Sequence, residues 1–549
     1  MIFTCIVPLI LTILIGLIGD TIFLPSISIF NPWLYVFLLL LCGIYALLHF
    51  LFLYIREQEG DAPTRAHFIS LGGAALAVVI LAAGWVFSLP LFQAVAYSSR
   101  LGEVSELSMT NLGITLDMTS LMDSESASLL AMQKLSSDQE LSSQYTLQNP
   151  TQILYNGAPV FIFSLDHANG LKALSNQSSV SAFITVDMQT GEASIHHTNE
   201  PMRYTPGAIW GKDLKRHLHY THPMSIISGS PHLEIDESGT PFYIAAVKKP
   251  SALLFGAPDI SGIIVVDPCT GETEFYPAAE APDWVDCVYP PEMLIAQAGD
   301  FGKLRHGFLN SVFKRDDILT ITPGYGLMND GESTYAYTCV SDGSTGSPSS
   351  GLLLIDMRTK SAQYLLLDGA DESAAMAAAV QAGDSSDCTA GFPLPLMVEG
   401  TPTYCMTLKA GDGSIRAYAM VNVNKPHLVA TGQTQEECQE SYKNLVLSND
   451  VSIPSGPNPG PDTSIASKGE ISGIVLDIRT GEKDGTTHFY LRLENSETWY
   501  VLSLKENEEA IKLNISDTVV LGIDSNAGSA DFVPAKLRSF MEGEPWWDA

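Results

Sequence analysis

Three histidines, His217, His219 and His222, form the densest histidine cluster of the chain, and His196 and His197 precede them. Imidazole nitrogens are frequent zinc ligands, and histidines two residues apart share one face of a β-strand. The segment 213–220 is predicted to form a helix instead, on which the rings of His217 and His219 diverge. His217 then lies one turn after Asp213, a spacing suited to an ion pair. We therefore predict no metal site here, and a metal-dependent hydrolase using this cluster is kept only as a third functional hypothesis.

A recurring group of aspartates could supply carboxylate oxygens to calcium. An apolar run is followed by Asp-x-x-Thr, usually with Gly next, at Asp187, Asp267, Asp356 and Asp477, with a degenerate copy at Asn422. One carboxylate per copy is too few for calcium, which takes about six to eight oxygen ligands. The pattern is typical of type I turns in which Asp accepts a backbone N–H and Gly adopts positive φ. We therefore predict β-hairpin turns rather than calcium sites.

The sequence contains none of the common catalytic motifs Gly-x-Ser-x-Gly, His-Glu-x-x-His, Cys-x-x-Cys or the P-loop. The glycine-rich run 343–351 has no lysine to hold phosphate and is predicted to be a loop. Trp284 lies between Asp283 and Asp286 and could line a sugar or peptide pocket, but a core position is favoured. We predict no catalytic residue, no cofactor and no metal ion, and hence a protein that is not an enzyme.

Three long apolar stretches must anchor everything that follows them. They cover residues 2–19, 33–55 and 68–87, and none contains Asp, Glu, Lys or Arg. A helix of about 20 apolar residues spans the ~30 Å hydrocarbon core of a bilayer. A cleaved signal peptide is the alternative for the first stretch, which lacks a basic start and a small-residue cleavage site. The prediction is a transmembrane domain of three helices within residues 1–97.

Basic residues in the short loops predict the orientation of these helices. The loop 56–66 carries Arg56 and Arg65, whereas the loop 20–32 carries no basic residue. The positive-inside rule places the loop with the arginines in the cytoplasm. The N-terminus then lies in the cytoplasm, and the chain after the third helix lies outside the plasma membrane.

The chain beyond residue 97 is strongly acidic, with 27 basic and 57 acidic residues and a net charge of −30. This balance excludes nucleic acid as a partner, because binding it needs a basic surface. It also argues against a domain that lies flat on anionic lipid. A solvated surface kept soluble by its charge is the favoured interpretation, and attraction of cations or of a basic wall component is the alternative.

Each predicted turn follows a second apolar run, and these upstream runs begin at Gly157, Gly239, Ser333 and Gly400. Successive turn residues from Asp187 to Asn422 are 80, 89 and 66 positions apart, which is too irregular for a solenoid. Helix signals fill the gaps, among them Asp371 before an alanine-rich segment, Pro291, and a capping box at 434–437. The predicted fold class is α+β, with tandem modules of a small antiparallel sheet and a helix over residues 98–450.

This repeated unit resembles PepSY-type domains, in which a small sheet and a helix end in a comparable Asp-x-x-Thr-Gly hairpin. The stretch 116–446 is similar to uncharacterised bacterial multi-span membrane proteins, and the runs that carry the similarity are 203–218, 233–243, 281–286 and 402–408. The resemblance covers about three-fifths of the chain. It implies an architecture and a location in the cell envelope, and it brings no known active site. PepSY units are loosely associated with the inhibition or regulation of peptidases.

A Pro-, Gly- and Ser-rich linker is predicted at 451–468, followed by a separate strand-rich domain at 469–540. Apolar runs at 471–478, 488–493, 498–504 and 519–523 predict short strands. About 70 residues of short strands fit a small β-barrel of the OB or SH3 type.

Six cysteines lie beyond the apolar stretches, at Cys269, Cys287, Cys339, Cys388, Cys405 and Cys438. An even number outside the cytoplasm allows disulfides, and small buried apolar residues are the alternative.

The features together predict a non-catalytic cell-envelope membrane protein whose extracytoplasmic domain is an interaction, scaffold or sensory module. The expected partner is a protein or a cell-wall component outside the membrane. Regulation or inhibition of an envelope peptidase is the alternative function.

Overall fold

A computed structural model describes residues 2–55, 65–102, 104–107, 114, 116, 119–168, 179–342, 351–367, 369–383, 388–448, 469–483, 486–493, 499–503, 505, 510, 512–513, 517–523 and 532–541. The chain divides into two compact units, Met1–Gly456 and Pro457–Ala549. The predicted linker 451–468, the loop segment 56–64 with Arg56, and residues 343–350 of the glycine-rich run lie outside the described residues.

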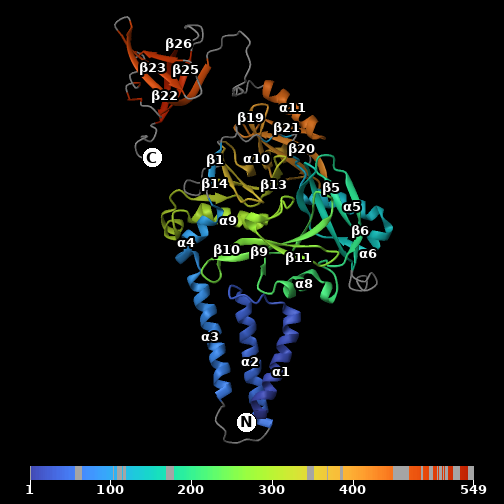
Figure 1. The fold of residues 1–549 in the computed structure, drawn as a ribbon. Coiled ribbons are helices and arrows are strands. Elements are labelled where there is room, and N and C mark those ends of the chain that lie inside the picture. The colour runs from blue at the N-terminus through green and yellow to red at the C-terminus, as the bar shows by residue number, and fades with distance from the viewer. Residues whose placement is uncertain are drawn as a thin grey trace. The chain divides into compact units, whose positions relative to one another are not determined.

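Three helices at the start of the chain are long and apolar enough to cross a membrane, as predicted. They are α1 (Ile2–Phe23), α2 (Pro32–Ile55) and α3 (Arg65–Phe87), drawn in blue in Figure 1. The first helix continues four residues beyond the predicted end at residue 19 and includes Asp20. That carboxylate lies beyond the apolar stretch, where it contacts His219 of the following domain.

Pro90 ends the third apolar stretch and starts a new helix, α4 (Pro90–Ser98), as proline at the first helical position allows. A single 3₁₀ turn, η1 (Ser99–Leu101), leads into β1 (Val104–Leu107). Strand β1 pairs in parallel with β16 (Ala362–Leu366), some 260 residues later in the chain. The chain that leaves the membrane helices therefore completes a sheet that is otherwise built from much later residues.

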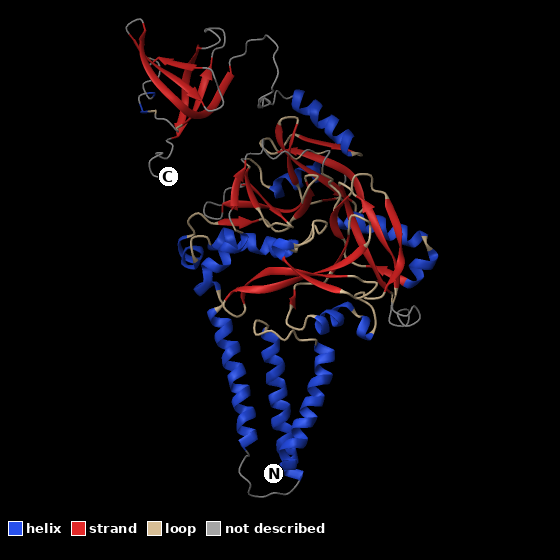
Figure 2. Cartoon of the chain, viewed as in Figure 1, coloured by secondary structure: helices blue, strands red, loops and turns tan. Residues whose placement is uncertain are grey.

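Four sheets, antiparallel except for the β1–β16 pair, make up the body of the first unit, and Figure 2 shows their strands in red. The first sheet contains β2 (Tyr145–Leu147), β3 (Thr151–Tyr155), β4 (Ala158–His167), β5 (Val180–Asp187) and β6 (Ala193–Met202). The second contains β7 (Ile226–Ile227), β8 (His232–Ile235), β9 (Pro241–Ala252), β10 (Gly256–Val266) and β11 (Thr273–Pro277).

The third sheet adds to β1 and β16 the strands β12 (Leu319–Ile321), β13 (Gly326–Asn329), β14 (Thr334–Asp342) and β15 (Gly351–Asp356). The fourth contains β17 (Thr389–Ala390), β18 (Leu394–Val398), β19 (Thr401–Lys409), β20 (Ile415–Asn422) and β21 (Val429–Gly432). Each sheet is built on three consecutive strands in a meander, which is the predicted repeat.

The Asp-x-x-Thr turns form at four of the five predicted positions. Asp187 Oδ1 accepts the backbone N–H groups of the second and third following residues at 2.9 and 2.8 Å. Asp267, Asp356 and the degenerate Asn422 make the same pair of bonds. Gly191, two residues before β6, has the positive φ of 72° that the pattern requires. These side chains therefore stabilise hairpins, as predicted.

Helices lie between and beside the sheets. They are α5 (Ser124–Ser137), α6 (Gln139–Gln144), α8 (Leu214–Thr221), α9 (Pro291–Leu304), α10 (Glu372–Ala382) and α11 (Gln435–Ser448). Short 3₁₀ or π turns occur at η3 (Trp210–Lys212), η4 (Ala278–Glu280) and η5 (Asn310–Lys314). The predicted caps of α10 and α11 are confirmed, since Ala374 N donates to Asp371 at 2.7 Å and Glu437 N to Thr434 at 3.1 Å.

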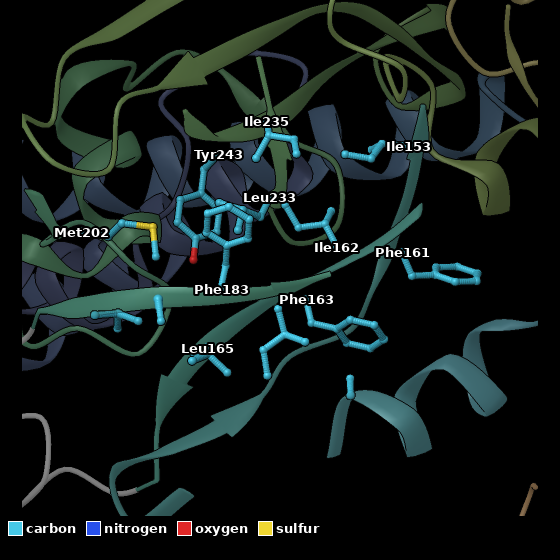
Figure 3. Packing of buried hydrophobic residues seen from close by; sticks show 14 of the residues in the cluster. Ile153, Phe161, Ile162, Phe163, Leu165, Phe183, Met202, Leu233, Ile235 and Tyr243 are labelled. Atoms are coloured by element: carbon cyan, nitrogen blue, oxygen red, sulfur yellow. The ribbon is translucent and has the colours of Figure 1, made fainter. Parts of the chain in front are cut away.

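A shared hydrophobic core joins the first two sheets. Figure 3 shows Phe183 of the first sheet beside Leu233 and Tyr243 of the second. Tyr243 is fully buried. A second core joins the third and fourth sheets and includes α10 and α11. Because each sheet completes its core with a neighbour, the modules form one continuous body.

The C-terminal unit is a barrel in which five strands pair in a closed cycle. In pairing order the strands are β22 (Gly469–Lys483), β23 (Thr486–Leu493), β24 (Trp499–Ser503), β26 (Phe532–Met541) and β25 (Thr518–Ile523). The fifth predicted turn, at Asp477, is wrong. Residues 477–483 pair continuously with β23, so the chain reverses only between Lys483 and Thr486.

The outer cysteines are mostly packing residues. Cys287, Cys339, Cys405 and Cys438 are buried, and their thiols form no disulfide. Trp284 is half-buried, and its ring centroid lies 5.1 Å from that of Phe242.

Candidate functional site

The histidine cluster is on a helix, as predicted, and its three rings contact three different elements. The Nε2 contacts are His217 with Gly271 O at 2.7 Å, His219 with Asp20 Oδ1 at 3.1 Å, and His222 with Thr273 Oγ1 at 3.0 Å. The predicted Asp213–His217 ion pair is not among the ion pairs of the described residues. The Asp213 carboxylate instead caps α8 by accepting the Arg216 N–H at 2.8 Å.

The described part of the chain contains no group of three or more His, Cys, Asp or Glu side chains that could hold a metal ion. The three imidazoles contact a hairpin turn, a membrane helix and strand β11, so they fix α8 in place. Burial lowers the pKa of His222, and the nearby His217 lowers it further.

A cleft of about 620 Å³ lies between the first and second sheets. It is lined by β5 and β6, by the β8–β9 turn and by the β10–β11 turn, with the side chains of Phe183, Thr185, His196, Thr198, Glu200, Ser238, Asp267 and Cys269 among others. This size is typical of ligand pockets, about 300 to 1,000 Å³. We call it the inter-sheet cleft.

His196 is held against one wall of the inter-sheet cleft. Its Nε2 lies 2.7 Å from Thr185 Oγ1, and its ring stacks on Phe183 with centroids 5.1 Å apart and an interplanar angle of 16°. Burial lowers the pKa of His196, so the ring is neutral at pH 7. The imidazole therefore offers a hydrogen bond rather than a positive charge to a ligand.

Cys269 lies in the same cleft but is poorly suited to nucleophilic chemistry. Its Sγ contacts the Glu200 carbonyl oxygen at 3.4 Å. Burial raises the pKa of this thiol, and the charges of Asp267 and Glu200 raise it further. A reactive cysteine needs the opposite environment, because the thiolate is the nucleophile.

Thr198 Oγ1, which also lines the cleft, is buried and has no hydrogen-bond partner among the described residues. Leaving a buried polar group unpaired costs about 1–3 kcal/mol, so a ligand group that bonds to it would gain affinity. The cleft offers hydroxyls, a neutral imidazole and acidic side chains. This arrangement can bind a polar or cationic segment, and it lacks an activated nucleophile.

A buried acidic junction connects three of the sheets. The fully buried Glu234 carboxylate accepts the backbone N–H groups of Asp286 at 2.8 Å and Cys287 at 3.1 Å. Asp286 Oδ2 accepts Leu154 N–H of β3 at 2.5 Å. Burial raises the pKa of Asp286 to about 7, and the Glu234 charge contributes in the same direction.

Two basic residues from the β15–β16 turn of the third sheet bind to the second sheet and the segment that follows it. The guanidinium of Arg358 donates to four backbone carbonyls, those of Ala281, Pro282, Asp283 and Val285, at 2.6–3.1 Å. Lys360 Nζ lies 2.6 Å from Asp259 of β10. Lys360 occupies the turn position where the copies at Asp187 and Asp267 have Gly, and it keeps a positive φ of 66°.

The membrane helices are bonded directly to the sheet domain. Ile27 N, in the loop between α1 and α2, donates to Pro223 O at 2.6 Å. Arg100 pairs with Asp300 of α9 and donates to Pro258 O at 2.8 Å. A Cβ at Gly84 of α3 would lie 2.5 Å from Cε2 of Phe255 in the β9–β10 turn, so a larger residue would require the Phe255 ring to move.

The sequence drew attention to His196 and Cys269 separately, and the structure brings them to one cleft. No local sequence pattern identified Thr198, Glu234 or Arg358, because the cleft around Thr198 and the hydrogen bonds of Glu234 and Arg358 involve segments far apart in the chain. Neither a protein-family model nor a curated protein matches this chain.

Proposed function

We propose that this protein is a non-catalytic membrane protein of the cell envelope whose sheet domain, outside the cytoplasm, binds a partner as an interaction or sensory module. The observation that carries the proposal is the inter-sheet cleft, which holds an unpaired buried hydroxyl in a body bonded to the membrane helices. Binding at the cleft would thus act on a domain whose position relative to the membrane is fixed.

The chemistry of the candidate side chains supports binding rather than catalysis. His217, His219 and His222 each contact a different structural partner. The pKa of the Cys269 thiol is raised rather than lowered. A general acid–base or nucleophilic mechanism needs such groups to converge on one substrate atom.

The orientation and the domain types belong to the same proposal. Arg56 and Arg65 lie in one membrane loop and no basic residue in the other, which favours a cytoplasmic N-terminus in the plasma membrane. The repeated helix-and-meander modules are consistent with PepSY-like domains of a bacterial envelope protein. The closed five-strand cycle is consistent with an OB- or SH3-like barrel.

Site-specific photo-crosslinking in intact cells tests the proposal. A photoreactive amino acid replaces Asn199, which is exposed and lines the inter-sheet cleft, and the matched control replaces the exposed Ser136 on α5. We expect a discrete adduct from position 199 and none from position 136. Capture of a peptidase there would favour the alternative that the protein regulates or inhibits an envelope peptidase.

Two results would overturn the proposal. One is equal crosslinking at both positions. The other is hydrolysis of peptidoglycan or peptide by the purified protein, with the activity abolished by a single substitution.

A further inference from the structure

A second cavity, of about 910 Å³, lies where α1 and α2 meet the sheet domain. Its walls come from the α1–α2 loop, the first turns of α2, helix α8, and the segments around β7 and the end of β9. We call it the juxtamembrane cavity. One wall therefore belongs to the membrane-spanning part of the chain and the other to the sheet domain.

The wall formed by α2 is apolar and reaches into the span. Trp33, Phe37 and Leu40 line it, and all three belong to the candidate membrane span Pro32–Ile55. At 1.5 Å per residue, Leu40 lies about 12 Å along the helix from Pro32. Trp33, at the first turn, is 70% exposed, a position typical of the interfacial aromatic belt. The lower part of the cavity is therefore at the depth of hydrocarbon chains.

The wall formed by the sheet domain carries two lysines. Lys215 of α8 and Lys248 of β9 both line the cavity, and neither forms an ion pair within the described part of the chain. Lys249 follows, with its Nζ 5.8 Å from the Phe30 ring centroid in the α1–α2 loop. These cations are unusual in a region beyond residue 97 whose net charge is −30.

The acidic groups at the same cavity are already engaged. The Asp213 carboxylate caps α8, and Asp20, below it, contacts His219. The two lysine ammonium groups are thus the cationic groups of this cavity that have no ion-pair partner within the described part of the chain. An anion would be attracted to this wall even though the domain as a whole repels anions.

We infer that the juxtamembrane cavity binds an anionic lipid of the surrounding bilayer, with its phosphate headgroup at Lys215 and Lys248 and a hydrocarbon chain along Phe37 and Leu40. A soluble phosphate would use only the lysines and leave the apolar wall in contact with water. A neutral lipid would use only the apolar wall. The combination of both walls at the end of a span fits a phospholipid of net negative charge.

The bound lipid would brace the sheet domain on the membrane. The cavity walls are joined by the bonds from Ile27 to Pro223 and from Asp20 to His219, so an occupant contacts both sides of that joint. The inference rests on α1 and α2 spanning a bilayer, and it is independent of the proposed partner at the inter-sheet cleft.

Lipid titration of the purified full-length protein in neutral detergent tests the inference. The unfolding temperature is measured against phosphatidylglycerol, phosphatidylcholine and soluble glycerol 3-phosphate. We expect a saturable rise with phosphatidylglycerol, because a ligand that binds only the folded state stabilises it. We expect no saturable rise with the other two.

Variants locate the binding site. The double variant Lys215→Gln/Lys248→Gln is expected to bind phosphatidylglycerol at least about tenfold more weakly, since each lysine beside an anionic lipid headgroup adds electrostatic attraction to the binding affinity. The control Lys134→Gln/Lys425→Gln removes the same charge outside the cavity and should leave the affinity unchanged. Leu40→Trp, which fills the apolar wall and keeps the lysines, should also weaken binding.

Three results would overturn the inference. They are an equal response to phosphatidylcholine, an equal response to glycerol 3-phosphate, and an unchanged phosphatidylglycerol affinity in the cavity double variant. None of them affects the crosslinking result at position 199, so failure of the lipid site is distinguishable from failure of the proposed function.

Discussion

Replacing Asp286 by Asn should stabilise the protein at alkaline pH and leave its stability nearly unchanged at acidic pH. Asp286 lies in the buried acidic junction beside Glu234, and its pKa is raised from 3.8 to about 7. The folded protein therefore binds a proton at this site between about pH 4 and pH 7, whereas the unfolded chain does not. Unfolding releases that proton, so stability falls as the pH rises through this window.

The size of the stability change follows from the pKa shift of Asp286. About three pH units at 1.36 kcal/mol each correspond to about 4 kcal/mol of stability lost between pH 4 and pH 8. Asn keeps an acceptor for the Leu154 N–H and removes the charge that faces Glu234. The variant should therefore be more stable than the wild type by up to about 4 kcal/mol at pH 8, and within about 1 kcal/mol of it at pH 5.

Urea unfolding of the detergent-solubilised protein, followed by tryptophan fluorescence, measures this difference at several pH values. Trp284 is two residues from Asp286, and its ring lies in tilted contact with that of Phe242, so it reports on the junction. Asp316→Asn is the matched control, because Asp316 is exposed. A difference between variant and wild type that stays constant from pH 5 to pH 8, or a variant that is less stable at pH 8, would refute the reasoning.

Three further substitutions test the contacts that hold the domain together. Arg358→Lys should lower the free energy of unfolding by about 2–4 kcal/mol, because Lys cannot donate the hydrogen bonds that the guanidinium group makes to four carbonyls. A urea midpoint equal to that of the wild type would contradict this expectation. Lys360→Gly removes the ion pair with Asp259 but also relieves about 1 kcal/mol of backbone strain at the positive φ. The free energy of unfolding, measured in the same assay, should therefore fall by about 1–3 kcal/mol. A gain in stability would show that the strain outweighs the ion pair. Gly84→Val should lower the unfolding temperature by several degrees, because its Cβ would collide with Phe255. The control Gly43→Val, which has no atom within 4 Å of its Cβ, should leave the unfolding temperature unchanged. Equal unfolding temperatures of the two variants would refute the close approach at Gly84.

Local chemistry explains why the turns and caps were predictable. Asp187, Asp267, Asp356 and Asn422 bond to their own following backbone, so a few residues contain all of the information. The copy at Asp477 fails because its strand pairs with β23 through residue 483, and long-range pairing overrides the local turn signal. The pairing register between β22 and β23 depends on the partner strand, which the local turn pattern does not contain.

Helix α5 was missed for a different reason. It buries the small side chains Ala127 and Ala131 with Leu135, a weak apolar pattern on a helix otherwise rich in Ser. The inter-sheet cleft and the acidic junction could not be predicted from the sequence either. Glu234 is hydrogen-bonded to Asp286, 52 residues away, and Arg358 to Val285, 73 residues away. No local sequence pattern predicts contacts over such separations.

Labelling with a membrane-impermeant maleimide in intact cells tests most directly whether the sheet domain stands outside the cytoplasm. Ser136→Cys places a thiol on the exposed face of α5, and Glu57→Cys places one in the loop between the second and third membrane helices. The account predicts that the cysteine at 136 is labelled in intact cells and that the cysteine at 57 is labelled only after permeabilisation, with unsubstituted protein as the background. The reverse pattern would contradict it.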